Sequence, residues 1–270
     1  KKMGVPGKIL CVLMLLSQQV FNDQETLHLP ANYTVGWMET LDDEKLISDI
    51  TLPGTHDSLA LYGGFIAKLF PLGKKLLIMH GLVYQNANLK DALETIKTFL
   101  SKYKSETVLV RVKPVLFFKS KVPILVGQMA KNDPDSWTDE TIPNIGQVRG
   151  KIVFVQKNLL LLHRLYETDK HNDYIVTNVE KKKEKIIKHL TETTYERYRA
   201  DYVVLNYSSG TGMPRLRLDI NPKSLAKQIN PWLYKHLDNE SKKTNPKPCF
   251  GVITMDFPGL DLIKKVTEFN

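Results

Sequence analysis

Two histidines and two aspartates in this sequence follow apolar runs that are typical of strands. The stretch DITLPGTHDS, residues 49–58, interrupts such a run with a Pro-Gly turn and places His56 beside Asp57. His80 closes the run LLIMH, and Asp256 closes GVITMD. An imidazole titrates near neutral pH and can act as base or acid, while a nearby carboxylate fixes its tautomer. The residues predict two histidines working around one scissile bond, with Asp57 or Asp256 as the orienting carboxylate.

Basic side chains follow two further strand-like runs, Lys113 after VLVRV and Lys157 after IVFVQ. A cationic rim of this kind suits a phosphodiester substrate. Zinc binding is the competing interpretation, but His56 and His80 lie 24 positions apart and no short-spaced His or Cys pair marks a ligand cluster. Glycine motifs that cradle phosphates or dinucleotides are absent from the sequence. We therefore expect no metal and no other cofactor.

Strand-like and helical patterns alternate along the chain, and together they must position these side chains. Apolar residues from Leu89 to Tyr103 recur at helical spacing, with Asn88 as a plausible N-cap. Continuous β-branched runs separated by helices predict a parallel sheet covered by helices, either open or closed into a barrel. Six such runs end in polar residues, among them Asn206, and this favours a barrel because its strands converge on one mouth.

The first 22 residues form a unit of their own, with a basic start, the apolar run ILCVLMLL and a polar continuation. This order predicts a secretory signal peptide, and a retained anchor is the alternative. The 42% hydrophobic composition then leaves enough apolar sequence for one large domain. Removing the leader takes away three lysines, so 35 basic residues face 29 acidic ones and the net charge is +6. That charge suits an anionic surface, although a solvated lysine-rich surface explains it equally well.

The leader carries Cys11, so a cleaved chain retains only Cys249 and can form no internal disulfide. We expect a secreted, extracellular protein. Sequons for N-glycosylation begin at Asn32, Asn206 and Asn239. The second lies in the strand-like run YVVLNYSSG, where a buried amide is favoured over a glycan.

Several motifs together resemble one known family. LPGTHDS, the MHG that follows, the helix running into SKYKSETVLVRVKP, the strand VRGKIVFVQK and the closing GVITMDF are similar to phosphatidylinositol-specific phospholipase C X-domain proteins. The likeness is to the small, single-domain, bacterial-like type, and it covers roughly residues 36–270. It implies an α/β fold with an irregular TIM-type (β/α) barrel.

The resemblance also implies roles for the acid–base residues. His56 would take the proton from the inositol 2-hydroxyl, which attacks phosphorus, and His80 would protonate the leaving diacylglycerol. Asp256 would orient His56, and Asp57 would assist near the phosphate. The products would be diacylglycerol and a cyclic inositol phosphate, made without calcium.

Head-group ligands are implied with less specificity. Lys113 matches a lysine that contacts the inositol, and Lys157 stands where relatives place a basic ligand. Asp173 and Tyr174 match loosely a later pair that holds the sugar. The expected partner is a membrane surface containing phosphatidylinositol, with no obligate protein partner.

The sequence departs from the family between THDS and HG. The usual strand of the Gly-Ile-Arg-x-x-Asp-x-Arg kind is absent, and the first arginine of the chain is Arg111. The phosphate-binding cation therefore has no counterpart, unless Lys68, Lys74 or Lys75 replaces it. We expect a barrel that lacks one strand, with KKLLIMH filling the gap or the barrel open there. Apolar residues of GGFIAKLFPLG, at 63–73, could serve as a membrane wedge or pack ordinarily.

Two functions follow, both using the same pocket. The first is a phosphoric diester hydrolase acting on phosphatidylinositol or its glycosylated derivatives, impaired by the missing strand. The second is a non-catalytic secreted protein of the same fold that binds inositol lipids. Nucleic-acid binding has little support, because no aromatic residues interleave with the basic ones as in a stacking platform.

Overall fold

The computed structural model describes residues 19–24, 29–58, 67–72, 75–80, 83–112, 121–139, 141–155, 165–166, 173–193, 202–243 and 246–270. Residues 1–18 of the predicted leader, including Cys11, lie outside this part of the chain. The predicted ligands Lys113 and Lys157 lie outside it too, as does Lys74. The side chains of the predicted membrane wedge, at 63–70, are likewise outside the described residues.

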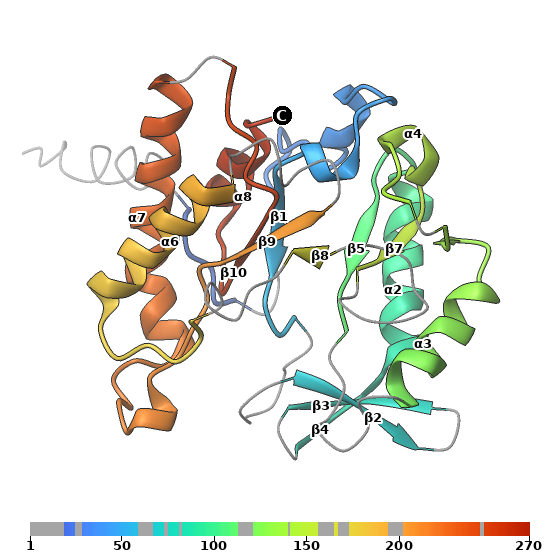
Figure 1. Cartoon of the computed structure of the whole chain (residues 1–270), viewed down its shortest axis with the longest axis horizontal. Coiled ribbons are helices and arrows are strands. Elements are labelled where there is room, and N and C mark those ends of the chain that lie inside the picture. The colour runs from blue at the N-terminus through green and yellow to red at the C-terminus, as the bar shows by residue number, and fades with distance from the viewer. Residues whose placement is uncertain are drawn as a thin grey trace, which may run out of the picture.

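A parallel sheet of four strands forms the centre of the molecule. Its order is β1 (Leu52–Thr55), β10 (Val252–Met255), β9 (Val203–Tyr207) and β8 (Leu165–Tyr166). Every residue of β9 and β10 is buried, as expected for continuous apolar strands covered on both faces. Figure 1 shows these strands beside a second group of strands at the centre of the fold.

The second group is also parallel. It has the order β5 (Val108–Val110), β7 (Ile152–Phe154) and β6 (Ser136–Trp137). Alternate residues of β7 face opposite sides: Val153 packs toward the first sheet, while Ile152 and Phe154 pack against helices.

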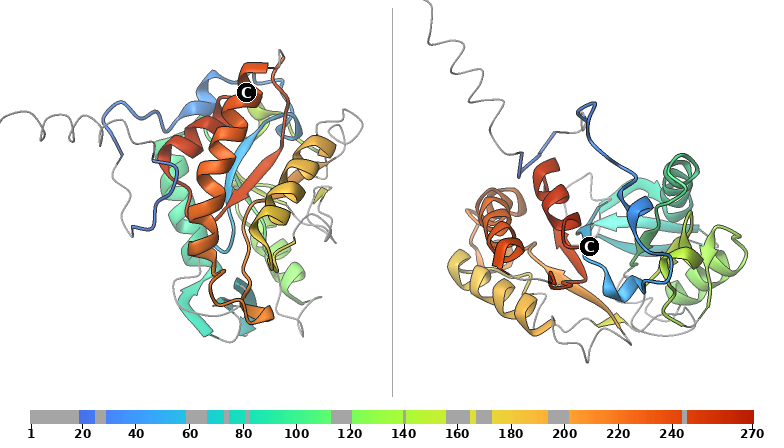
Figure 2. Two further views of the ribbon diagram at one scale, coloured as in Figure 1. Left: turned by 90° about the vertical axis from the view of Figure 1, so that its left-hand side faces the viewer. Right: turned by 90° about the horizontal axis from the view of Figure 1, so that it is seen from above.

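Helices enclose both sheets, and Figure 2 shows them gathered on two sides. Asn88 begins the first long helix with a capping box, because its side chain accepts a hydrogen bond from the Asp91 N–H while the Asp91 side chain accepts one from the Asn88 N–H. This confirms the predicted N-cap. The helices are α2 (Leu89–Lys102), α3 (Lys121–Lys131), α4 (Ile145–Val148), α6 (Val179–Thr193), α7 (Pro222–Lys243) and α8 (Leu260–Thr267), with 3-10 turns η1 (Trp37–Thr40), η2 (Ile47–Asp49) and η5 (Met213–Arg215).

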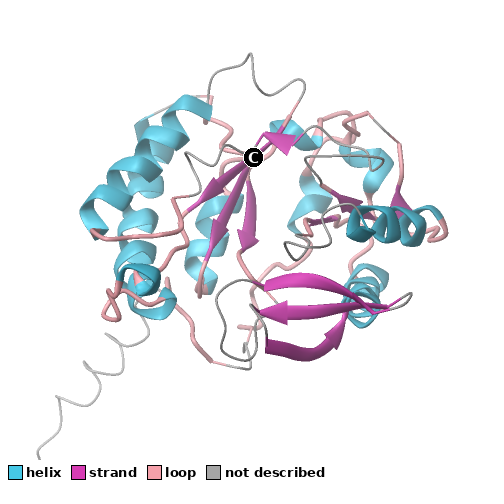
Figure 3. Ribbon diagram, turned by 60° about the horizontal axis from the view of Figure 1, so that its bottom comes forward, coloured by secondary structure: helices cyan, strands magenta, loops and turns pink. Residues whose placement is uncertain are grey.

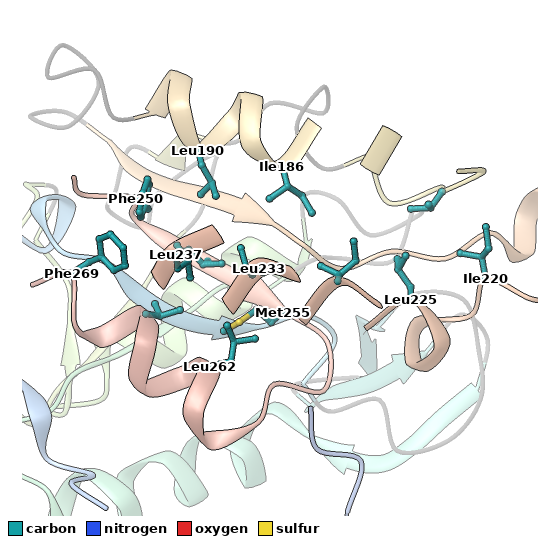
Figure 4. Close-up of a cluster of buried hydrophobic side chains, with 14 residues drawn as sticks. Ile186, Leu190, Ile220, Leu225, Leu233, Leu237, Phe250, Met255, Leu262 and Phe269 are labelled. Atoms are coloured by element: carbon teal, nitrogen blue, oxygen red, sulfur yellow. The ribbon is translucent and has the colours of Figure 1, made fainter. Parts of the chain in front are cut away.

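The largest core cluster lies between the first sheet and helices α6, α7 and α8. Ile253 and Met255 of β10 face it, whereas Val252 faces the space between the two parallel sheets. Figure 4 shows the cluster, with Leu233 and Leu237 of α7 among its members. This packing fixes the direction in which β10 leaves the sheet, and so it places Asp256.

A third sheet is antiparallel and lies near the end of β1 (Figures 1 and 3). It consists of β2 (Ala67–Leu72), β3 (Lys75–His80) and β4 (Val83–Asn88) in that order. The expectation that LLIMH forms one of the converging parallel strands is therefore wrong, as is the expectation that KKLLIMH fills the gap in the barrel. The hairpin partners of β3 satisfy its backbone hydrogen bonds locally, which removes it from the parallel strands.

The parallel strands do not close into a barrel within the described residues. There β1 pairs only with β10 and β5 only with β7, so the two strands are not hydrogen-bonded to each other. Both instead line a cavity of about 700 Å³, which α2 borders from outside. The other expectation, a barrel left open where the missing strand belongs, stays a prediction, because residues 59–66 and 113–120 lie outside the described part of the chain.

Two smaller predictions can be placed. Asn206 is buried and its side-chain amide donates to the Phe250 carbonyl oxygen, so this sequon is a core amide. Cys249 is also buried, and its Sγ lies 3.7 Å from the Ser48 carbonyl oxygen. Among the described helices, none has the length and hydropathy of a membrane span.

Candidate acid–base site at the carboxyl end of β1

His56 is held at the end of β1 by backbone pairing with β10. Its N–H donates to the Met255 carbonyl oxygen at 3.2 Å, so the pairing extends one residue beyond the strand. The imidazole side chain is only 10% exposed, and its Nδ1 lies 3.5 Å from Asp57 Oδ2. Asp57 adopts φ 49°, a left-handed conformation that is costly for a residue with a side chain. The prediction of a Pro-Gly turn is wrong, because Pro53 and Gly54 lie within β1 and pair with Ile253 and Thr254. The turn comes later, at Asp57, and it brings imidazole and carboxylate together.

Two tyrosine rings flank His56. The Tyr174 ring centroid lies 4.8 Å from the imidazole centroid, and the Tyr207 ring stands edge-on at 6.1 Å. The Tyr207 hydroxyl accepts a hydrogen bond from Arg111 Nη1 at 3.2 Å. Arg111 therefore reaches from beyond β5 across to β9, and it lines the same cavity as His56 and Asp57.

Sequence reasoning missed Arg111 and Tyr207 as site residues. It followed the polar residues that end each strand, and so it selected Lys113 rather than the arginine inside the same apolar run. A charged side chain alternating with valines in VLVRVKP is the signal that was available.

Asp256 directly follows β10, the strand that pairs with β1, and is partly buried. Its Oδ2 accepts a hydrogen bond from the Gly210 N–H at 3.3 Å, while Asn230 Nδ2 donates to the Asp256 carbonyl oxygen at 3.0 Å. The pKa of Asp256 is raised to about 7, mainly by burial and in part by the negative charge of Asp57, against the lowering effects of Gly210 and Lys182. The carboxyl group therefore changes charge in the range where an imidazole also titrates.

Lys182 of α6 supplies a buried positive charge to this cluster. Its Nζ donates to the Asp173 carbonyl oxygen at 3.3 Å, and the residue is 2% exposed. Burial lowers the pKa of Lys182 to about 8, although Asp173 and Asp256 act in the opposite direction. No sequence pattern separated this lysine from its neighbours in VEKKKEK.

The predicted pair Asp173 and Tyr174 divides between two surroundings. The Tyr174 ring contacts His56 at a tilt of 37°, and burial raises the pKa of its hydroxyl, with contributions from Asp256 and Asp57, so it stays a phenol. The Asp173 carboxylate instead pairs with Lys185 of α6 at 2.7 Å. Of the two, only the tyrosine ring is brought to the imidazole by a contact in the structure.

His80 ends β3, where its backbone pairs with Ala67 and Val83. Its side chain is outside the described part of the structure. Ile78 of the same strand lines the cavity that holds His56, so β3 borders the site. In the described ranges, no group of three or more His, Cys, Asp or Glu side chains is arranged to hold a metal ion.

The assembled groups are suited to proton transfer next to an anion. A mostly buried imidazole has carboxylates nearby that can stabilise its protonated form. An arginine in the same cavity carries a planar fork of N–H donors that matches phosphate oxygens. The cavity behind these groups is mainly apolar.

Comparison with known proteins finds similarity to bacterial phospholipases C. The 1-phosphatidylinositol phosphodiesterase of Listeria monocytogenes is 26% identical, with 88% of this chain and 85% of the relative aligned. The solved phosphatidylinositol-specific phospholipase C of the same organism superposes with a TM-score of 0.66 at 25% identity, covering 87% of this chain and 97% of that one. The chain is therefore homologous to bacterial phosphatidylinositol-specific phospholipase C, an enzyme with a TIM-type fold.

A second enzyme supports the fold assignment alone. The phosphatidylinositol-specific phospholipase C of Staphylococcus aureus superposes with a TM-score of 0.69 at 19% identity, over 87% of this chain and 96% of that one. A scan against protein-family models gave no match.

Proposed function

We propose that this protein is a secreted phosphodiesterase that cleaves phosphatidylinositol or its glycosylated derivatives. The observation that carries the proposal is the placement of His56, with its carboxylate neighbour and Arg111, in one cavity of a chain homologous to bacterial phosphatidylinositol-specific phospholipase C. The products are diacylglycerol and a cyclic inositol phosphate.

The chemistry assigned to the site is an intramolecular displacement at phosphorus. His56 removes the proton of the inositol 2-hydroxyl, and that oxygen forms a bond to phosphorus. The bond from phosphorus to the glycerol oxygen breaks, and His80 gives its proton to the departing oxygen. Asp57 and the ionised form of Asp256 stabilise the His56 imidazolium while it holds the proton.

Arg111 is assigned the role of the phosphate-binding cation. The Gly-Ile-Arg strand of the family is missing from the sequence, and Arg111 Nη1 already contacts Tyr207, whose ring stands against His56. A guanidinium can bind two phosphate oxygens at once and stabilise charge that develops on them. Lys113 and Lys157 are proposed as further head-group ligands from the resemblance.

The test follows product formation from phosphatidylinositol vesicles in the presence of a chelator. The purified chain should release cyclic inositol phosphate, and either His56→Ala or His80→Ala should abolish that release. His236 lies on α7 and is not among the residues of the candidate site, so the matched substitution His236→Ala should leave the rate unchanged. Absence of product from the unaltered chain would reject the enzyme.

The second candidate function is inositol-lipid binding without turnover. The specific observation in its favour is that, among the described residues, β1 and β5 are not hydrogen-bonded to each other, at the place where the family resemblance leads us to expect a strand bearing arginine. Vesicle binding that depends on phosphatidylinositol, without cyclic product, would establish this alternative.

A further inference from the structure

The cavity between β1 and α2 has a size and lining that differ from those of a head-group pocket. Its volume of about 700 Å³ falls within the range of sites for drug-sized ligands. Residues Leu52 to His56 line it in succession, which corresponds to a length of ~13 Å along the strand. The cavity therefore extends well below the groups that would contact a phosphate.

One face of α2 is apolar and only half-buried where it meets this cavity. Ala92, Ile96 and Phe99 are spaced four and three residues apart, so they lie on the same face of the helix. The adjacent face, with Leu93 and Leu100, is buried in the core cluster against β3. Ala92, Ile96 and Phe99 pack against the edge of the same core cluster, and the rest of their surface lines the cavity together with Leu89 and Leu93.

The charged groups of the cavity are separated along its length. His56, Asp57 and Arg111 lie at the carboxyl end of the strands, whereas Glu106 lies at the opposite end. The Glu106 carboxylate accepts hydrogen bonds from the Met38 N–H and from Ser105 Oγ, each at 3.0 Å, and burial raises its pKa. The described middle of the cavity is lined by aliphatic and aromatic side chains.

The exposed edge of β1 is poorly suited to an added strand. Leu52 and His56 both direct their N–H groups to β10, at 2.9 and 3.2 Å. Because backbone donors alternate along a strand, the nitrogen of Pro53 belongs to the opposite edge, where proline has no hydrogen to donate. A hydrocarbon chain makes no such demand on the backbone.

We propose that this cavity binds the single hydrocarbon chain of an anionic amphiphile, with the anionic group held by Arg111 and His56. The shared chemistry is that of a fatty acid or a lysophospholipid. This inference rests on the proposed function only for the choice of an inositol phosphate as the preferred head group. It implies that the protein takes up one-chain lipids as monomers, in addition to acting at a bilayer.

The experiment uses the full chain and the fluorescent fatty acid cis-parinaric acid, below the concentration at which it forms micelles. The probe should bind with one site per chain. Lysophosphatidylinositol should displace it, and glycerophosphoinositol, which has the same head group without a chain, should not. Saturated fatty acids should compete about fourfold more tightly for each added methylene until the cavity is full. Stronger displacement by lysophosphatidylinositol than by a fatty acid of equal length would identify the phospholipid as the source.

Two cavity-filling variants localise the binding. Ala92→Phe and Ile96→Trp should each weaken probe binding at least tenfold, while Thr98→Phe, on the same helix but outside the cavity lining, should not change it. Circular dichroism verifies that each variant is folded, and either filling variant suffices for the test. Binding that ignores chain length, or that survives both filling variants, would overturn the inference.

The result is separable from the proposed function. Turnover of phosphatidylinositol without probe binding rejects the chain site and leaves the enzyme. Probe binding without turnover supports the chain site and rejects the enzyme.

Discussion

At the scale of single residues, the chemistry depends on groups gathered around His56. Asp57, in its left-handed conformation, and the tilted ring of Tyr174 both contact the imidazole. The guanidinium of Arg111 is tied to the same cluster through Tyr207. Substitutions of Arg111 and of Asp256 test the role of each group.

Replacing Arg111 should slow turnover if it binds the phosphate. We expect Arg111→Met to lower kcat/KM about a hundred- to thousandfold, the usual cost of one preorganised donor. Arg111→Lys should recover only part of the rate, because a point charge lacks the guanidinium fork. Inositol 1-phosphate should inhibit the variant weakly while free inositol inhibits it normally. Equal losses for both inhibitors would contradict the assignment.

Asp256 should make stability depend on pH. Its pKa is about 7 in the folded chain against 3.8 ordinarily, so the folded state holds the proton more tightly. That contribution is complete below pH 4 and is lost as pH rises through about 7. Asp256→Asn should remove this pH-dependent fall in the free energy of unfolding, which is on the order of 2–4 kcal/mol.

Urea unfolding at pH 4.5 and pH 8 measures the effect. The exposed carboxyl of Glu39 provides a control. The free energy of unfolding of Glu39→Gln should fall with rising pH as much as that of the unaltered chain. The same ionisation should raise activity through pH 7, because only the carboxylate stabilises the imidazolium. Identical slopes for Asp256→Asn and the unaltered chain would refute the assignment.

At the scale of elements, the loop after β9 is the most exposed apolar segment described. Leu216 is 87% exposed and Leu218 is 67% exposed, and arginines alternate with them in PRLRL. The loop begins at the site, since Gly210 is bonded to Asp256. An apolar loop with interspersed positive charge suits an anionic membrane surface.

Leu216→Asp should weaken binding to vesicles containing phosphatidylinositol by about tenfold or more, since burying one leucine contributes roughly 1.5–3 kcal/mol. Hydrolysis of a soluble cyclic inositol phosphate should stay unchanged. Ile187→Asp, on α6, is the matched control and should bind vesicles normally. Vesicle sedimentation is the measurement, and equal loss in both variants would contradict a role for this loop.

The sequence predicted the elements better than their partners. The N-cap at Asn88, the apolar period of α2 and the strands β9 and β10 are local patterns, and each appears as predicted. The placement of β3 could not be predicted in this way, because a short apolar run suits a parallel strand and a hairpin equally. Arg111 was missed for a related reason: its role depends on reaching Tyr207 on β9, 96 positions away.

At the scale of the whole molecule, β1 and β5 line one cavity and, within the described ranges, are not hydrogen-bonded to each other. Inserting a strand-forming segment between β1 and β2 should pair it with the edge of β5, and more weakly with β1 because Pro53 donates no hydrogen bond, and so fill the cavity. We expect Tm to rise and cis-parinaric acid binding to be lost together, because the inserted strand and the hydrocarbon chain would occupy the same cavity. Calorimetry and fluorescence measure the two effects. A stabilised protein that still binds the probe would show that the strand and the hydrocarbon chain occupy different places.

Cys249 offers a way to measure the rate at which β1 and β10 separate. Its thiol is enclosed between the start of β10 and the turn at Ser48, and Phe250 is bonded to Thr51 Oγ1 at 2.9 Å. With Cys11→Ser, a thiol reagent can react at one position only. The rate of alkylation, followed by mass spectrometry, then measures how often β1 and β10 separate. It therefore gives the opening rate of the segment that carries His56.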